Sequence, residues 1–303
     1  MDLVLSDDRT SLTTVAPAKL NLCLHVVGRR ADGYHLLQSV FVLLDLCDTL
    51  SFLPRNDGVI RRVSDLPGVN EEVDLVMRAA RLLQREAGTA PGTDPRFAMS
   101  AETLGADITI QKTIPMGAGL GGGSSDAATT LLALNQLWNL GFSREQLCTM
   151  ALTLGADVPF FVFGRDAFVE GVGETLQAVE LPRWWYLVLT PPVQVATRAV
   201  FAHPELTRNT FPLKISDFST LGLVNMRNDL QPIVLKEFPI IFRFLEALQA
   251  VSQKSVFGAR MTGSGACVFA AFELERHARD AFQKLPPEYK GFIAQGLSRH
   301  PFS

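Results

Sequence analysis

The feature that most constrains this chain is residues 115–125, which read Pro-Met-Gly-Ala-Gly-Leu-Gly-Gly-Gly-Ser-Ser and hold five glycines. A short strand is predicted before this segment, over 107–112, and apolar residues follow it at helical spacing: Ala127, Ala128, Leu131 and Leu132. Glycines let the backbone approach a ligand closely, and successive amide N–H groups form a concave anion site. The start of the helix adds unpaired N–H groups and the positive end of its dipole. The segment therefore predicts a polyphosphate-binding loop, in which Ser124 and Ser125 supply hydroxyl groups to phosphate or magnesium.

Neither of the two commonest phosphate-loop designs fits this segment. Gly117, Gly119 and Gly122 satisfy the dinucleotide pattern, but the ribose-binding acid expected about 20 residues later is missing from 137–143. The P-loop pattern fails because no lysine follows Gly122. A plain strand-to-helix turn would need only one or two glycines. A phosphate loop of a third design is the interpretation that is left.

Strand and helix patterns alternate along the rest of the chain. Residues 18–27 read as a strand with one apolar face, and the opposite face carries Lys19, Asn21, Cys23 and His25. The pattern changes after Phe163, which places a domain boundary near 160–180 and predicts domains over 1–165 and 166–303. Further elements are predicted at these places: a helix over 71–87, a capping box of Ser143 and Gln146, a strand over 185–189, a helix near 238–251 and a strand-loop-strand unit over 260–272.

Composition excludes several classes of protein. The 28 basic and 31 acidic residues give a net charge of −3, which argues against a general nucleic-acid binder. Apolar runs are too short for a membrane helix, and the first ten residues lack the pattern of a secretory signal. The four cysteines form no C-x-x-C pair and no metal-ligand spacing with histidine, so we expect free thiols in a cytoplasmic protein.

Four motifs in the same order resemble a known family. The segment 115–125 is similar to the phosphate loop of the GHMP kinases, the superfamily of galactokinase, homoserine kinase, mevalonate kinase and phosphomevalonate kinase. Three further stretches resemble the 4-diphosphocytidyl-2-C-methyl-D-erythritol kinase family, and the likeness runs from about residue 13 to 295. They are Ala-Pro-Ala-Lys-Leu-Asn-Leu at 16–22 with Asp-Gly-Tyr-His at 32–35, Leu-Gly-Ala-Asp-Val-Pro-Phe-Phe at 154–161 with Glu-Gly-Val-Gly-Glu at 170–174, and Arg-Met-Thr-Gly-Ser-Gly-Ala-Cys-Val-Phe at 260–269.

The resemblance implies a fold and a reaction. The fold is α+β, a two-domain GHMP kinase with an interdomain catalytic cleft. The reaction moves the γ-phosphate of ATP to the 2-hydroxyl of the cytidylylated methylerythritol in non-mevalonate isoprenoid synthesis. The expected partners are this small molecule, ATP and Mg²⁺, with no nucleic acid, no membrane and no protein residue assigned as a metal ligand, in a monomer or homodimer. ATP would bind the whole loop: Pro115, Met116, Gly117, Ala118, Gly119, Leu120, Gly121, Gly122, Gly123, Ser124 and Ser125.

Three alternatives stay open at this point. The first is a related kinase for another alcohol, such as homoserine or mevalonate, against which Tyr34 and His35 argue. The second is a nucleotide-binding regulator on a decayed kinase scaffold, which would be expected to have lost Lys19 or Asp157. The third is a dinucleotide-dependent oxidoreductase.

Two residues allow both a structural and a catalytic interpretation. Asp157 follows a helix end predicted at Gly155 and precedes Pro159 by two residues, which suits a helix N-cap. The resemblance instead places a catalytic aspartate here, which accepts the proton of the attacking hydroxyl or orients it. Lys19 reads from its pattern as a solvated lysine on a polar strand face. The resemblance makes it the catalytic partner that keeps Asp157 ionised.

Substrate-binding residues follow from the same comparison. Asn21 shares the face of Lys19 and is expected to hydrogen-bond the substrate. The resemblance implies that Tyr34 and Phe201 sandwich the cytosine ring and that His35 hydrogen-bonds its edge. From pattern alone, Tyr34 reads as a surface residue of a turn and Phe201 as a core residue. Gly263 and Gly265 fit either a hairpin turn or a support for the phosphate loop.

Overall fold

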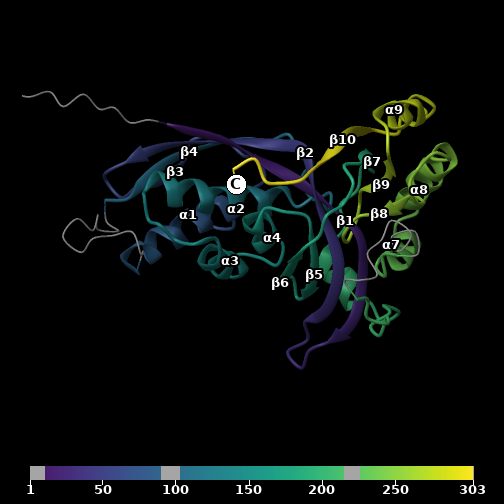
Figure 1. The fold of residues 1–303 in the computed structure, drawn as a ribbon, viewed down its shortest axis with the longest axis horizontal. Coiled ribbons are helices and arrows are strands. Elements are labelled where there is room, and N and C mark those ends of the chain that lie inside the picture. Colours follow the sequence, from purple (N-terminus) through teal and green to yellow (C-terminus); the bar gives the residue numbers. More distant parts are fainter. Residues whose placement is uncertain (1–10, 90–102, 215–225, 303) are drawn as a thin grey trace, which may run out of the picture.

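The structure is a computed structural model that describes residues 11–89, 103–214 and 226–302. Its central feature is a long antiparallel ribbon made of β1 (Leu12–Arg29) and β2 (His35–Arg55). Figure 1 shows helices α1 to α4 on one side of this ribbon and α7 to α9 on the other. The register of the ribbon shifts at three places, between Pro17 and Lys19, between Asn21 and Cys23, and between Val26 and Gly28.

The bulged ribbon corrects one expectation from the sequence. From its pattern alone Lys19 reads as a solvated lysine, but it is buried, as are Asn21 and His25 on the same strand. Both faces of β1 are covered, one by the helices of the first half and one by the second half of the chain. The alternating pattern therefore separates two buried environments, and a solvated Lys19 is excluded.

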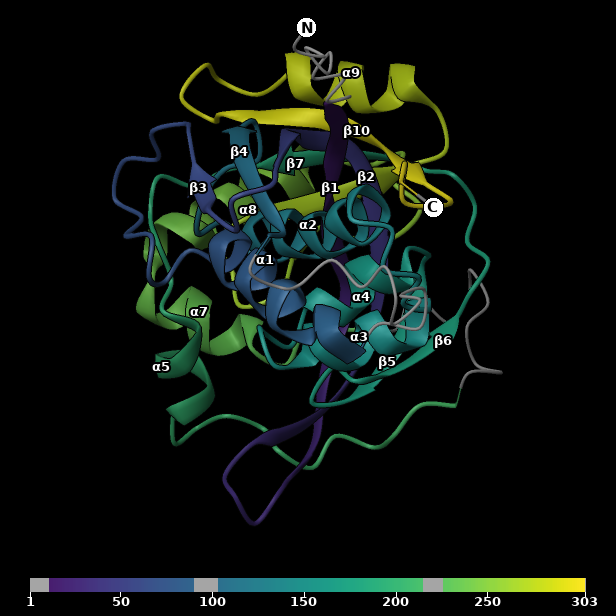
Figure 2. The ribbon, with the colours of Figure 1, turned by 90° about the vertical axis from the view of Figure 1, so that its left-hand side faces the viewer.

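The first half is a sheet covered by helices. On one edge of β2 lies β4 (Gly105–Gln111), which also pairs with the short β3 (Ile60–Arg62). Near its start β2 pairs with β5 (Ala167–Gly171), which pairs in turn with β6 (Thr175–Ala178). In Figure 2 the helices of this half lie together on the side of the ribbon that faces the viewer. They are α1 (Leu75–Glu86), the 3-10 helix η1 (Ala87–Thr89), α2 (Gly122–Leu137), α3 (Arg144–Leu152) and α4 (Val158–Phe163).

Local signals explain where two of these helices begin. The predicted capping box is confirmed, because Ser143 Oγ accepts from Gln146 N and Gln146 Oε1 accepts from Ser143 N. The helix predicted from residue 71 begins later, at Leu75. Asp74 is its N-cap and accepts a hydrogen bond from Val76 N at 2.9 Å, so Val73 lies outside the helix and is exposed.

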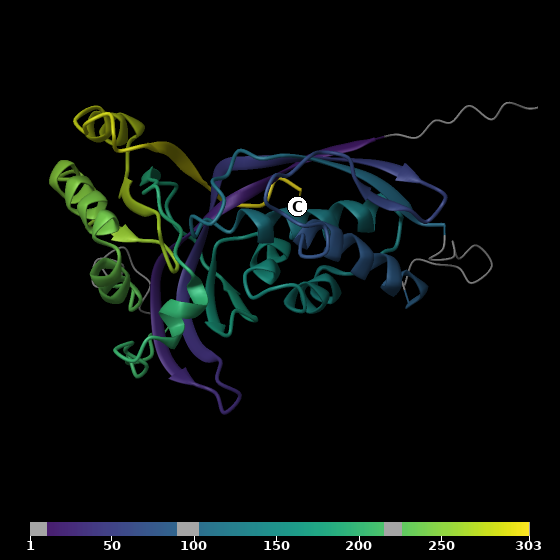
Figure 3. The same cartoon turned by 180° about the vertical axis from the view of Figure 1, so that it is seen from behind.

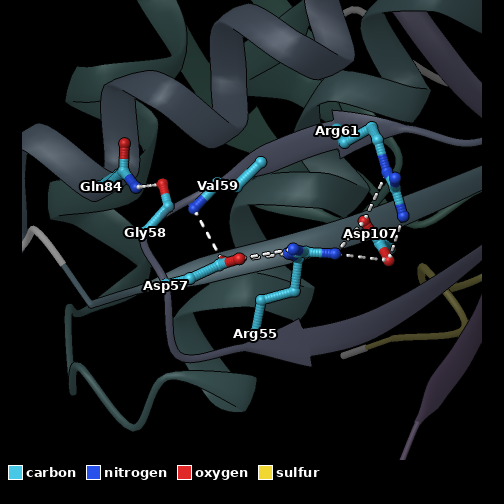
Figure 4. A network of polar contacts seen from close by, with 7 residues as sticks. All are labelled: Arg55, Asp57, Gly58, Val59, Arg61, Gln84 and Asp107. Atoms are coloured by element: carbon cyan, nitrogen blue, oxygen red, sulfur yellow. Dashed lines mark hydrogen bonds and ion pairs between the residues drawn. The ribbon is translucent and has the colours of Figure 1, made fainter.

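Arginine ion pairs tie the far edge of this sheet together. Arg55 on β2 pairs with Asp57 at 2.5 Å and with Asp107 on β4 at 3.1 Å. Arg61 on β3 reaches the same carboxylate of Asp107 at 2.9 Å (Figure 4). The shared carboxylate of Asp107 links β2, β3 and β4 at an edge remote from the loop 115–125. We therefore give this network a structural role and not a catalytic one.

The second half continues the same sheet and carries its own helices, as the view from behind shows (Figure 3). The sheet order is β3-β4-β2-β10-β7-β9-β8, with β10 (Gly291–Leu297) joining β7 to β2. The predicted strand over 185–189 is β7 (Trp185–Leu189), and the unit over 260–272 forms β8 (Arg260–Met261) and β9 (Val268–Phe272). The helices of this half are α5 (Thr197–Ala202), α7 (Gln231–Glu237), α8 (Pro239–Val251) and α9 (Glu275–Gln283).

Three buried apolar clusters lie along the molecule: one under the helices of the first half, one around the middle of the ribbon, and one under the helices of the second half. The division at residue 165 stays a prediction, because β1 and β2 contribute to all three. Among the described residues, no helix is both long and apolar enough to cross a membrane.

Candidate active site

The glycine segment forms a tight loop that leads directly into α2. Gly117, Gly119 and Gly121 all have positive φ angles, of 69°, 78° and 72°, and α2 starts at Gly122 inside the glycine run. A Cβ atom on Gly119 would lie 2.8 Å from the carbonyl oxygen of Gly265. Only glycine fits such a backbone without strain. The loop lines a cavity of about 350 Å³ together with Lys112 and Asp126.

Backbone hydrogen bonds fix this loop to strands from both halves of the chain. Lys19 N on β1 donates to Leu120 O at 2.9 Å. Cys267 N, just before β9, donates to Ala118 O at 3.3 Å. The predicted support of the loop by the segment around Gly263 and Gly265 is therefore present, since that segment packs directly against the loop.

Lys19 and Asp157 meet beside the loop. The buried Lys19 Nζ lies 3.3 Å from Asp157 Oδ2, 2.5 Å from Asn21 Oδ1 and 4.8 Å above the centre of the Phe41 ring. Asp157 directly precedes α4, but its side chain makes no capping hydrogen bond, which removes the purely structural interpretation. The Asp157 side chain is 35% exposed and lines a central cavity of about 330 Å³. One charged pair thus faces an open space next to the glycine loop.

Asn21 is held by a network that joins the two halves. Its backbone N donates to Thr262 Oγ1 at 2.9 Å, and its side-chain Nδ2 donates to Ser39 Oγ at 3.1 Å. The two amide hydrogens of Asn228 bond to Met261 O and Gly263 O, at 3.0 and 2.8 Å, and so hold the turn after β8 from behind. No sequence motif pointed to Ser39 or Asn228 as part of this site. Thr262 lies inside a recognised motif, and that motif was the available signal.

A third cavity, of about 750 Å³, brings Tyr34, His35 and Phe201 together. Tyr34 is 66% exposed, and the ring of Phe201 packs on His35 with centroids 5.2 Å apart. His35 Nε2 accepts a hydrogen bond of 3.0 Å from Arg208 Nε, which leaves Nδ1 as the donor nitrogen of a neutral ring. Burial, followed by the charges of Arg208 and Arg29, lowers the pKa of His35 and favours this neutral form. Arg208 carried no recognisable signal in the sequence.

The three cavities adjoin one another. The loop cavity and the central cavity share Gly119, Gly121 and Ser124. The central and third cavities share four lining residues, namely Leu37, Ala156, Val172 and Phe201. A path therefore runs from the loop, past Lys19 and Asp157, to the aromatic residues. Residues from both halves of the chain line this path.

A buried acidic pair lies under the start of α2. Lys112 Nζ bridges Asp126 Oδ2, at 2.6 Å, and Asp48 Oδ2. Asp126 Oδ1 and Ser125 Oγ are buried and have no hydrogen-bond partner among the described residues. Burial, with the nearby charge of Asp48, raises the pKa of Asp126 to about 7, although Lys112 opposes the shift. Within the described ranges, no group of three or more His, Cys, Asp or Glu residues forms a metal site by itself.

Comparison with known proteins identifies the class to which this fold and site belong. The family model of the GHMP kinase N-terminal domain matches residues 74–165, and that of the C-terminal domain matches 213–291. The crystal structure of a homoserine kinase from Cytophaga hutchinsonii has the same fold, with a TM-score of 0.65 at 17% identity over 99% of both chains. The chain is thus a GHMP kinase with the α+β fold that the motifs implied.

Closer relatives narrow the class. A 4-diphosphocytidyl-2-C-methyl-D-erythritol kinase from Nitrosospira multiformis is 56% identical over 295 residues, which cover 97% of this chain and 94% of the relative. One from Thiobacillus denitrificans is 56% identical over 94% of this chain and 95% of the relative. A crystal structure of 4-(cytidine 5'-diphospho)-2C-methyl-D-erythritol kinase has a TM-score of 0.77 at 34% identity, over 94% of this chain and 99% of its own. The chain belongs to the 4-diphosphocytidyl-2-C-methyl-D-erythritol kinase family.

Proposed function

We propose that this protein transfers the γ-phosphate of ATP to the 2-hydroxyl of 4-diphosphocytidyl-2-C-methyl-D-erythritol. The observation that carries the proposal is the position of the Lys19–Asp157 pair. It lies where the cavity of the glycine loop meets the cavity that leads to Tyr34, His35 and Phe201. A phosphate donor on one side and a cytidine-bearing acceptor on the other would meet at these two side chains.

The proposed chemistry is an in-line displacement. The acceptor oxygen attacks the γ-phosphorus, the bond from that phosphorus to the bridging oxygen breaks, and ADP leaves. Asp157 takes the proton of the acceptor hydroxyl or orients that hydroxyl, and Lys19 keeps the carboxylate ionised at 3.3 Å. Positioning and charge compensation supply most of the catalysis of phosphoryl transfer. The loop amides and the ammonium of Lys19 are placed to provide both.

Magnesium fits this site as a companion of the nucleotide. Mg²⁺ prefers oxygen ligands and in phosphate sites is bound through one or two carboxylates plus the phosphates. Asp126 lines the loop cavity and has one oxygen without a partner among the described residues, and the hydroxyl of Ser124 lies at the junction of two cavities. We propose that these two residues hold the ion, which neutralises phosphate charge when bound.

Specificity for the acceptor is proposed to come from the third cavity. The exposed Tyr34 and the ring of Phe201 offer faces for stacking a cytosine base, and His35 Nδ1 is free to donate to its edge. Asn21 is proposed to hydrogen-bond the methylerythritol portion near Lys19. We further propose the division at residue 165 between the two domains and a cytoplasmic location, in which the four cysteines stay free thiols.

A coupled assay of ADP release tests the function. The full chain is assayed with ATP, Mg²⁺ and one acceptor at a time: the cytidylylated methylerythritol, homoserine or mevalonate. We expect turnover with the first acceptor only. Turnover with homoserine or mevalonate instead would overturn the proposed substrate, and no ADP release with any acceptor would overturn the proposed reaction.

A further inference from the structure

A fourth cavity lies away from the loop cavity, the central cavity and the aromatic cavity. Its volume is about 380 Å³, similar to that of the central cavity beside Lys19. It is bordered by the segment that follows α4, by the segment before β7 and by the end of β10. No residue that lines it also lines the loop cavity, the central cavity or the aromatic cavity.

Three arginines surround this cavity, one from each bordering segment: Arg165, Arg183 and Arg299. Elsewhere arginines such as Arg55, Arg62 and Arg227 are neutralised by aspartates. In contrast, the guanidinium groups of Arg165 and Arg299 have no ion pair or hydrogen bond with any residue that the structure describes. Arg183 donates one hydrogen bond, to Ser298 Oγ. Guanidinium groups converging from separate segments are well suited to binding phosphate.

The inner wall of the cavity offers two buried polar groups. Asp166 is 9% exposed, and its Oδ1 accepts a hydrogen bond from Leu43 N at 3.0 Å. The structure shows no hydrogen bond to Asp166 Oδ2 from the described residues. Tyr186 is 1% exposed and lines the same cavity, and its hydroxyl likewise has no partner within the described ranges. Neither of these two oxygens is among the described side-chain atoms that are fully buried without a partner, so both are open to the cavity and can meet polar groups of a ligand.

We propose that this cavity is a second ligand site, which binds a small phosphate monoester whose other end carries hydroxyl or amino groups. The arginines at the rim bind the phosphate. The Asp166 carboxyl and the Tyr186 hydroxyl hydrogen-bond the polar groups at the other end. The volume is within the range of small-molecule sites, which start near about 300 Å³. The proposal does not depend on the kinase reaction, because none of these residues touches the cleft.

The cavity is also connected to the catalytic pair through the fold. Leu43, whose amide bonds to Asp166, is the cross-strand partner of Lys19 in the ribbon. Helix α4 begins directly after Asp157 and ends two residues before Arg165. A ligand bound in this cavity would therefore lie next to the β1–β2 ribbon, which carries Lys19, and next to the end of α4, the helix that follows Asp157.

Isothermal titration of the full chain with sn-glycerol 3-phosphate tests the site. The double variant with Arg165→Ser and Arg299→Ser should weaken binding by at least about tenfold, because it removes two charged donors to the phosphate. Both side chains are exposed, so folding should be unaffected, which thermal unfolding checks. The matched control is Arg276→Ser, which removes an exposed arginine of α9 outside the cavity and should leave affinity unchanged.

Tyr186→Phe tests the contact with the hydroxyl-bearing end of the ligand separately from the contacts with its phosphate. It removes only the hydroxyl and should weaken binding of glycerol 3-phosphate while leaving binding of inorganic phosphate as in the wild type. Glycerol alone should not bind measurably. Equal affinity of the wild type and the double arginine variant would overturn the proposal, and so would an equal loss in the Arg276→Ser control. ADP release in the coupled assay should persist in the double variant. A failure of the proposed ligand site can therefore be distinguished from a failure of the proposed kinase reaction.

Discussion

Replacement of Asp157 by asparagine is the sharpest test of the cleft. The change keeps the shape of the side chain and an oxygen that can accept from Lys19 Nζ, now 3.3 Å from the carboxylate. It removes the negative charge and the ability to take a proton. We expect kcat to fall by about 10²–10⁴-fold, the usual contribution of a general acid–base group. The readout is the rate of ADP release at saturating ATP and acceptor.

The same variant should barely change stability, which separates catalysis from folding. The Asp157 side chain is 35% exposed, and asparagine keeps an oxygen that can accept from the buried Lys19 ammonium, so no buried donor loses its partner. Asp157→Ala, in contrast, leaves the buried Lys19 ammonium with only Asn21 as a hydrogen-bonding partner and should cost about 1–3 kcal/mol in urea unfolding. Glu145→Gln, at an exposed acid in the first turn of α3, is the matched control for both measurements. A kcat for Asp157→Asn within about threefold of the wild type would refute the proton-accepting role.

Four further changes probe the cleft and its support. Lys19→Met removes the ammonium that pairs with the Asp157 carboxylate and should reduce kcat by at least about 100-fold, whereas a wild-type rate would contradict the proposed role of Lys19. Tyr34→Ala should raise KM for the cytidylylated acceptor by about tenfold, the value of one stacked base, and leave KM for ATP unchanged; equal effects on both would argue against stacking. Asn228→Ala removes the two donors that hold the turn at Gly263, and should lower kcat more than it raises either KM; a loss confined to stability would assign Asn228 to the fold alone. Asp126→Asn tests a pH dependence: because the pKa of Asp126 is raised to about 7 from 3.8, the folded state binds its proton more tightly, and stability from this group is lost as pH rises from about 4 to about 7. In urea unfolding across this range, the free energy of unfolding should fall less steeply with pH in the asparagine variant than in the wild type. An equally steep fall in both would contradict the raised pKa of Asp126.

Elements whose signals lie within a few residues were predicted well. The capping box at Ser143, the strand over 185–189 and the helix that follows the glycine loop are all present. Each depends on hydrogen bonds or side-chain periodicity that the local sequence fixes. The start of α1 was placed too early, because Asn70 and Asp74 are both suitable caps and only the structure shows that Asp74 accepts the bond from Val76.

Burial could not be derived in the same way. The pattern of β1 predicted one alternation over 18–27, but register shifts break it, and Cys23 packs in the same apolar cluster as Leu20 and Leu22. The pattern also could not say that Lys19 would be buried against Phe41 and Asp157. Arg208 shows the same limit. Its contact with His35 joins residues 173 positions apart, and no local pattern marks a residue that serves a distant partner.

The sequence by itself determined the tight backbone of the glycine loop, because glycines at 117, 119 and 121 permit backbone angles that other residues resist. Its ordered motifs also determined the family. Only the tertiary structure decided that Asp157 faces Lys19 instead of capping α4, and that Thr262 anchors Asn21 from 241 residues away. The physical reason is that a charge or a hydrogen bond acts over a few ångströms of space, whatever the separation along the chain, and only the folded chain sets those distances.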